Sequence, residues 1–359
     1  MLTNIATWVY RVNLVNKIEN RTIGTITTPL NTLLKNFSIV LVVSAIGIGA
    51  AAYETGNILG GAMGLSTISG IDPNVWGPVM AIIAFIVLWT GSYKVIEKVL
   101  IGLVILMSFC FIMTALIIKP DIPAILAGIF VPTIPKGEGL TLVISLIGTT
   151  IVPYNLFLHA SSVLDKWDGP EDIKAARFDT VFSLILGGLI TLSVVVTASA
   201  AFHGTGAEIT GAGQMAKQLE PLLGSWAKWF FAVGLFGAGF SSATTAPLAG
   251  AYATAGALGW ERDLKSKKYR TILVIILLVG LFGSMLGTSP IQVIIFAQAA
   301  NGILLPISAI YLLWVMNNKD KLGEHVNGTL SNVLGVIVIS LTVIMGVRSL
   351  ISVISKFIG

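Results

Sequence analysis

Charge is scarce in this sequence: only 11% of its 359 residues are Asp, Glu, Lys or Arg, whereas soluble domains average about 25%. Its single cysteine, Cys110, permits no internal disulfide, and three scattered histidines cannot form a zinc cluster of the usual spacing. These shortages exclude a soluble enzyme, a disulfide scaffold and a disordered chain. Apolar residues are abundant instead, at 55% with a mean hydropathy of +0.90, which indicates a polytopic membrane protein.

Nine apolar stretches are long enough to cross a bilayer, which takes about 20 helical residues. None shows the alternation of apolar and polar residues found in membrane barrels, so we expect an all-α polytopic protein. Residues 1–35 are predicted to form an amino-terminal segment, and residues 36–359 the membrane domain. The predicted spans are 36–66, 77–93, 99–118, 141–162, 180–202, 229–259, 271–288, 291–316 and 332–355.

Lysine and arginine are distributed unevenly over the connecting loops. Sixteen fall in every second loop, beginning with residues 1–35, and four fall in the loops between. Because cytoplasmic loops carry the excess of positive charge, the pattern predicts a cytoplasmic amino terminus and, with nine spans, a carboxyl terminus outside. Residues 205–223, in one of the outside loops, are expected to include a surface helix.

Charged side chains at membrane depth are costly and usually functional, and few occur here. Glu54 lies inside the first predicted span, where it either handles protons or ions or is a structural carboxyl bonded to a neighbouring helix. His159 lies near the inner end of 141–162 and either lines a polar pathway or only anchors its helix.

The span 141–162 is interrupted by Gly148-Thr-Thr-Ile-Val-Pro-Tyr-Asn-Leu-Phe-Leu-His159. Pro153 removes a backbone donor, and such a break in a membrane helix is tolerated where the freed backbone faces protein or water. Broken helices of this kind supply ion sites in secondary transporters, whereas a bare proline kink supplies none. The polar neighbours Thr149, Thr150, Tyr154 and Asn155 favour a binding site.

Three further patterns lie at membrane depth. Gln298 and Asn301, followed by Pro306, are suited to line a cavity. Small residues favour close helix packing in two places, the Gly56-xxx-Gly60-xxx-Gly64 pattern and the segment 237–250.

Four of these segments, in this order, resemble the helices of the Nramp family of divalent-metal transporters. Its third helix resembles Glu54-Thr-Gly-Asn-Ile-Leu-Gly-Gly-Ala-Met-Gly-Leu65, and its sixth resembles the broken segment 148–159. Its eighth resembles Gly237-Ala-Gly-Phe-Ser-Ser-Ala-Thr-Thr-Ala-Pro-Leu-Ala-Gly-Ala-Tyr252, and its tenth resembles Ala297-Gln-Ala-Ala-Asn-Gly-Ile-Leu-Leu-Pro306. The resemblance implies a LeuT-type inverted-repeat fold, with a metal site between the broken first and sixth helices.

The sequence departs from the family pattern at the site itself. Val152 stands where the family has its metal-binding methionine, Thr149 where it has an alanine, and Tyr154 where it has the first histidine. Glu54 and Asn57 stand at two acidic positions. Since a thioether favours softer metals and oxygen ligands suit magnesium, the pattern is similar to that of the Nramp-related magnesium transporters.

The family's first-helix motif, Asp-Pro-Gly-Asn, is absent. Asp72-Pro-Asn74 lies in a short loop between two spans and is interpreted as a turn. The span 36–66 then corresponds to the family's third helix, so that the nine spans correspond to its helices 3–11 and the chain is expected to be truncated at its amino terminus.

The leading hypothesis is a secondary transporter of divalent cations in the plasma membrane, with Mg²⁺ favoured over Mn²⁺ and Fe²⁺. No enzymatic activity, cofactor or nucleic-acid partner is expected; the partners are the transported ion and the lipid bilayer. The alternatives are a truncated remnant that does not transport, and a LeuT-type transporter of an organic solute. The resemblance assigns Thr149, Val152, Asn155 and Gln298 to the metal site, and Glu54, Asn57, Tyr154, His159 and Asn301 to a proton or polar pathway.

Overall fold

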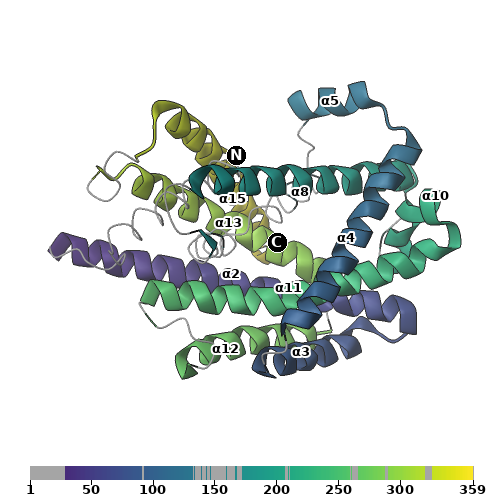
Figure 1. Ribbon diagram of the computed structural model, residues 1–359, viewed down its shortest axis with the longest axis horizontal. Helices are drawn as coiled ribbons and strands as arrows, with labels where there is room; N and C mark the ends of the chain where they lie inside the picture. The colour runs from purple at the N-terminus through teal and green to yellow at the C-terminus, as the bar shows by residue number, and fades with distance from the viewer. Residues whose placement is uncertain are drawn as a thin grey trace.

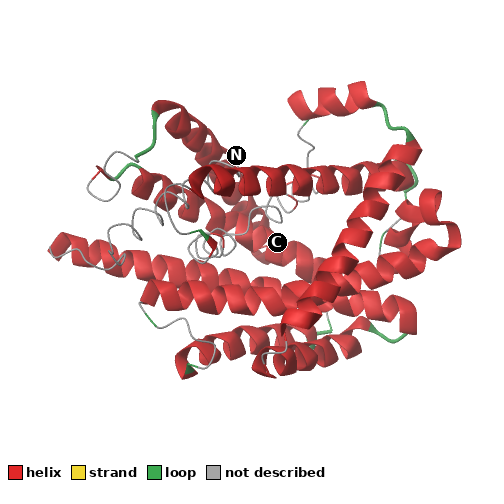
Figure 2. Ribbon diagram, in the orientation of Figure 1, coloured by secondary structure: helices red, strands yellow, loops and turns green. Residues whose placement is uncertain are grey.

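The computed structural model describes residues 29–90, 93–131, 172–206, 211–258, 266–287, 290–319 and 326–358, with isolated positions between these ranges. Helices make up nearly all of these residues, and the described ranges contain no strand (Figure 2). The prediction of an all-α protein is therefore confirmed.

Eight of the nine predicted spans coincide with long helices, most of which extend a few residues beyond the prediction. The span 141–162 lies outside the described residues except at isolated positions. Helix α2 begins inside the predicted amino-terminal segment. The eight helices, labelled in Figure 1, are α2 (Pro29–Ser69), α3 (Pro73–Thr90), α4 (Tyr93–Ile118), α8 (Ile173–Phe202), α11 (Ala227–Leu258), α12 (Lys267–Ser284), α13 (Pro290–Met316) and α15 (Thr329–Ile358).

Four described stretches are by themselves both long and apolar enough to cross a membrane: Pro73–Thr90, Lys98–Ile118, Lys174–Phe202 and Ala212–Tyr252. They contain four of the nine predicted spans in whole or in large part. The count of nine remains a prediction for the other five, which include the glycine-rich α2 with its buried Glu54.

Two connections contain short helices. Between α4 and α8 lies α5 (Ile122–Phe130), which the sequence had placed in an outside loop. Between α8 and α11, where a surface helix was expected, the chain forms the short pieces α9 (Ala212–Met215), η2 (Ala216–Leu219), α10 (Glu220–Leu223) and η3 (Gly224–Trp226). Gly224, with a positive φ of 51°, ends α10.

The turn predicted at Asp72 is confirmed. The Asp72 carboxylate accepts hydrogen bonds from the backbone N–H of Asn74 at 2.7 Å and from its side-chain amide at 2.9 Å. These bonds hold the start of α3, and Gly70, with φ of 76°, ends α2 just before it. Asp72 therefore stabilises the turn between α2 and α3.

Helices α2 and α11 lie side by side in Figure 1 and approach each other backbone to backbone. A Cβ built on Gly64 would lie 2.5 Å from the carbonyl oxygen of Ala232 and 2.7 Å from the nitrogen of Phe236. A Cβ on Gly239 would meet the backbone of Gly61. Close approach through small residues is how membrane helices gain van der Waals contact, since lipid gives them no hydrophobic drive to associate.

The prediction that the pattern Gly56-xxx-Gly60-xxx-Gly64 packs closely against a neighbouring helix is only partly correct. Gly64 packs against α11, but the Cβ position on Gly60 meets no described atom within 4 Å. Gly61, outside the pattern, makes the second close contact. By contrast, the expected packing role of 237–250 holds at Gly237, where a Cβ would lie 3.0 Å from Cβ of Leu103, and at Gly239.

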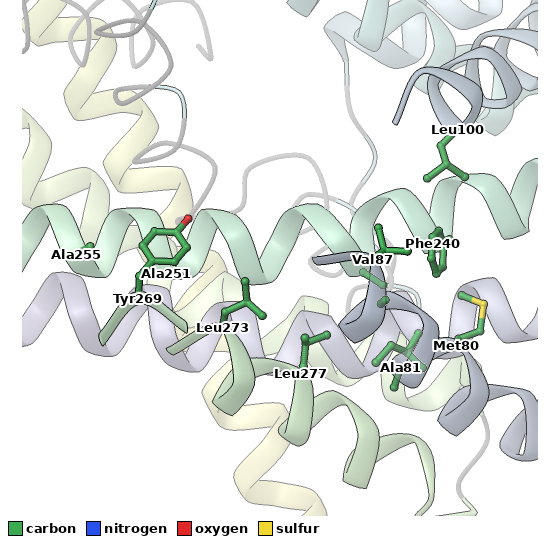
Figure 3. Close-up of a cluster of buried hydrophobic side chains, with 13 residues drawn as sticks. Met80, Ala81, Val87, Leu100, Phe240, Ala251, Ala255, Tyr269, Leu273 and Leu277 are labelled. Atoms are coloured by element: carbon green, nitrogen blue, oxygen red, sulfur yellow. The ribbon is translucent and has the colours of Figure 1, made fainter. Parts of the chain in front are cut away.

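Helices α3 and α12 pack with α2 and α11 around one apolar core (Figure 3). Ile58, Met80, Phe240 and Leu277 contribute to it from these four helices. At one end of this core the Tyr269 hydroxyl donates to the carbonyl of Leu248 at 3.1 Å, which ties α12 to α11. These four helices form the closely packed part of the protein that carries the candidate site.

Candidate functional site

Glu54 on α2 is the one acidic side chain in the described residues that is completely buried. Helix α12 passes it at a glycine: a Cβ on Gly280 would lie 2.6 Å from Cγ of Glu54. Within the described part of the chain, neither carboxylate oxygen has a hydrogen-bond partner. Sequence position alone indicated an intramembrane carboxyl; the structure adds that it lies against the backbone of a distant helix.

The neighbouring turn fixes α2 against α12. A Cβ on Gly283 would collide with the side chain of Thr55, and the Thr55 hydroxyl donates to the carbonyl of Val279 at 3.5 Å. Glu54 is thus held between helices whose contacts leave no room for larger side chains.

Asn57 lies one turn beyond Glu54, and its side-chain amide nitrogen is also buried without a hydrogen-bond partner among the described residues. On its other side, the backbone carbonyl of Asn57 lies 2.9 Å from where a Cβ of Gly239 would be. The two side chains are neighbours whose amide and carboxyl groups interact without forming a regular hydrogen bond. The structure therefore brings together two of the nine predicted site residues, at the junction of α2, α11 and α12.

The buried side chains of Glu54 and Asn57 are suited to bind a proton or a cation. A buried polar group without a partner costs free energy, about 1–3 kcal/mol for a neutral group and more for a charged one. A carboxyl in such a place is suited to receive a proton or a hard cation, whose binding removes that cost. Across the described ranges, no three His, Cys, Asp or Glu side chains gather where they could hold a metal ion.

Of the predicted metal ligands, Thr149, Val152 and Asn155 lie outside the described residues, as does Tyr154. Gln298 and Asn301 lie on α13, three positions apart and so on one face of this helix; their side chains are outside the description. For these six residues the predicted roles stay predictions.

His159 is partly buried, and its Nε2 atom has no hydrogen-bond partner among the described residues. The acidic group whose charge acts on its ring is Asp179, near the start of α8. Asp179 also forms an exposed ion pair with Lys166 at 3.1 Å. His159 therefore lies near the end of α8 predicted to be cytoplasmic, where both of its predicted roles, lining a pathway and anchoring its helix, stay predictions.

Sequence reasoning missed the residues that make room for Glu54. Gly280 and Gly283 interrupt an otherwise bulky α12, and this interruption was the available signal. It also missed three linked asparagines between α13 and α15. Asn332 accepts hydrogen bonds from Asn317 at 2.9 Å and from Asn327 at 3.1 Å, which closes the connection between these helices.

Comparison with known proteins agrees with this architecture. The profile of the family described as Nramp, natural resistance-associated macrophage protein-like, matches residues 27–352. A protein of Caldanaerobacter subterraneus subsp. tengcongensis named divalent metal cation transporter MntH is 27% identical over 306 residues, which cover 83% of this chain and 72% of the relative. A protein of the same name from Klebsiella pneumoniae is 26% identical over 299 residues, covering 82% and 71%.

Solved structures share the fold. The crystal structure of a point mutant of the Eremococcus coleocola manganese transporter superposes with a TM-score of 0.72 at 19% identity, covering all of this chain and 78% of the other. The same transporter in complex with an aromatic bis-isothiourea substituted compound gives a TM-score of 0.75 at 18% identity, with the same coverage. The expected helical transporter fold is confirmed by these likenesses. Because the family profile spans most of its length, the chain belongs to the Nramp family and is a membrane transporter, not an enzyme.

Proposed function

We propose that this protein carries a divalent metal cation across the bilayer by alternating access, and that Mg²⁺ is favoured over Mn²⁺ and Fe²⁺. Membership of the Nramp family supports the transport of a divalent cation, as do relatives named divalent metal cation transporters. The same names do not favour the alternative of an organic solute. The carrier is proposed to lie in the plasma membrane with its amino terminus in the cytoplasm, as the distribution of basic loop residues indicates.

The observation that carries the proposal is the buried carboxyl of Glu54, which has no hydrogen-bond partner among the described residues. A carboxyl with a purely structural role is normally hydrogen-bonded to the groups that it ties together. The Glu54 oxygens have no such partner in the described structure, while the surrounding glycine contacts hold the residue in place. This arrangement suits a group whose partner is a proton or cation that arrives and leaves during each cycle.

The proposed ion site is formed by Thr149, the Val152 carbonyl, Asn155 and Gln298. Glu54, Asn57, Tyr154, His159 and Asn301 are proposed to line the adjoining proton or polar pathway. The break at Pro153 would supply backbone carbonyls to the ion, and α13 would present Gln298 and Asn301 from one face.

The preference for magnesium rests on ligand chemistry. With valine at position 152, the predicted site has no thioether, and its remaining donors are oxygen atoms. Mg²⁺ prefers oxygen ligands and sheds its waters reluctantly, so a site of hydroxyls, carbonyls and amides suits a partly hydrated ion. The site would bind Mn²⁺ and Fe²⁺ less well, because it lacks the thioether that favours these softer ions over Mg²⁺.

Transport into proteoliposomes tests the proposal. The protein is reconstituted with a magnesium-sensitive dye inside the vesicles, and uptake is measured with Mn²⁺ or an amino-acid mixture as competitor. We expect saturable magnesium uptake that amino acids do not inhibit and that Glu54→Gln reduces by at least about tenfold, equivalent to about 1.4 kcal/mol. The matched control is Glu220→Gln, since Glu220 is exposed at the start of α10. Uptake that survives Glu54→Gln unchanged would remove Glu54 from the mechanism, and saturable uptake of an amino acid would overturn the proposed substrate.

A further inference from the structure

Helix α5 is apolar along its whole length but buries none of its side chains. Its nine residues, Ile122-Pro-Ala-Ile-Leu-Ala-Gly-Ile-Phe130, contain no polar side chain. Its large exposed residues and the one that follows show from 49% to 80% of their surface: Ile122, Leu126, Ile129, Phe130 and Val131. In Figure 1, α5 stands clear of the other helices beyond the end of α4. No described part of the protein covers it.

The start of α5 is specified by its local sequence. Lys119 is the one non-glycine residue with a positive φ, 51°, among the described residues, and Pro120 follows it. The Asp121 carboxylate then accepts a hydrogen bond from the backbone N–H of Ala124 at 3.1 Å, which caps the helix. The chain therefore leaves α4 through a sharp turn and begins a new helix, so α5 is a defined element.

An apolar helix that is exposed on all sides is unfavourable in water, because every face adds apolar surface to the solvent. From Ile122 to Pro135 the sequence contains no charged residue, and Asp121 and Lys136 bracket this stretch. At about 14 Å, α5 is too short to cross a hydrocarbon core of about 30 Å. Its length and apolarity fit a segment that enters one leaflet without crossing the membrane.

The surface of α5 continues the lipid-facing surface of α4. The last turn of α4 exposes Leu116 and Ile117, and only three residues separate it from Ile122. The charged pair Lys119 and Asp121 lies at the turn, where it can reach the headgroups while the apolar residues on both sides lie in hydrocarbon. We propose that α5 lies at the membrane interface of the leaflet at the end of α4, with its apolar side chains among the lipid acyl chains and both helix ends at the level of the headgroups.

Site-directed spin labelling in proteoliposomes tests this placement. Leu126→Cys and Ile129→Cys are labelled separately, and collisions with oxygen and with the water-soluble nickel complex NiEDDA are measured for each. Neither residue is buried, so the substitutions remove no core contact. The native Cys110 is buried, and the unsubstituted protein measures its background labelling. Phe109→Cys on α4 is the lipid-facing reference, and Lys217→Cys on η2 is the water-facing one.

We expect both α5 labels to resemble Phe109→Cys, with frequent oxygen collisions and few nickel collisions. Nickel collisions as frequent as those of Lys217→Cys would place α5 in water and overturn the proposal. Few collisions with either reagent would show that protein, from a second copy or another subunit, covers α5, and this would overturn it as well. The result does not depend on whether the protein transports magnesium.

Discussion

Two glycines of α2, four residues apart, should respond in opposite ways to the same substitution. In Gly64→Ala, the new Cβ lies 2.5 Å from the carbonyl oxygen of Ala232, about 0.9 Å short of the 3.4 Å at which ordinary contact begins. The atoms in its way are backbone, so α2 and α11 must move apart. Overpacking of this kind costs about 1–3 kcal/mol. In Gly60→Ala, the Cβ meets no atom of the described residues within 4 Å, and the higher helix propensity of alanine stabilises by up to about 1 kcal/mol.

The measurement is thermal unfolding in detergent micelles, followed by the fluorescence of the eight tryptophans. We expect Gly64→Ala to unfold at a lower temperature than the unsubstituted protein, and Gly60→Ala at the same or a higher one. Gly188→Ala on α8, whose Cβ position is also open, is a second control. Equal losses from Gly60→Ala and Gly64→Ala would refute the reasoning, because both glycines would then pack against a neighbour. An unchanged Gly64→Ala would show that α2 and α11 are not in backbone contact.

Four further predictions concern single side chains. Glu54→Gln should unfold at the same or a higher temperature than the unsubstituted protein, because an amide is cheaper to bury than a carboxylate without a partner. Val152→Met should increase the affinity for Cd²⁺ relative to Mg²⁺ in calorimetry, because it adds a soft ligand. Lys268→Cys in oriented vesicles should react with an impermeant maleimide from the cytoplasmic side only. Asn332→Leu should destabilise by about 1–3 kcal/mol in the same thermal assay, because it leaves the side-chain amide of the buried Asn327 without its acceptor.

Each of these has an outcome that contradicts it. A large loss of thermal stability in Glu54→Gln would make the carboxyl structural. Cadmium binding that is unchanged in Val152→Met would mean that position 152 does not face the ion. Labelling of Lys268→Cys from outside would invert the predicted topology, and an unchanged unfolding temperature in Asn332→Leu would show that the asparagine cluster does not stabilise the connection.

Local sequence was sufficient for the helices and for some of the turns. Apolar runs of membrane-spanning length predicted eight helices that the structure shows, because a chain in lipid must satisfy its backbone hydrogen bonds within each segment. The turn at Asp72 was predictable for a similar reason, since its bonds reach only two residues along the chain. Where neighbouring residues determine the geometry, the sequence pattern is enough.

The contacts between helices were decided only by the tertiary structure. The repeat of Gly56, Gly60 and Gly64 does not say which glycine packs against α11. That depended on the placement of α11, a helix distant in the sequence, which contacts the Cβ position of Gly64 but not that of Gly60. Likewise, the sequence located Glu54 in a membrane helix, but its burial against Gly280 required α12 to pack across it. The position and apolarity of each helix follow from its own residues. The surroundings of a side chain depend instead on which distant backbone approaches it.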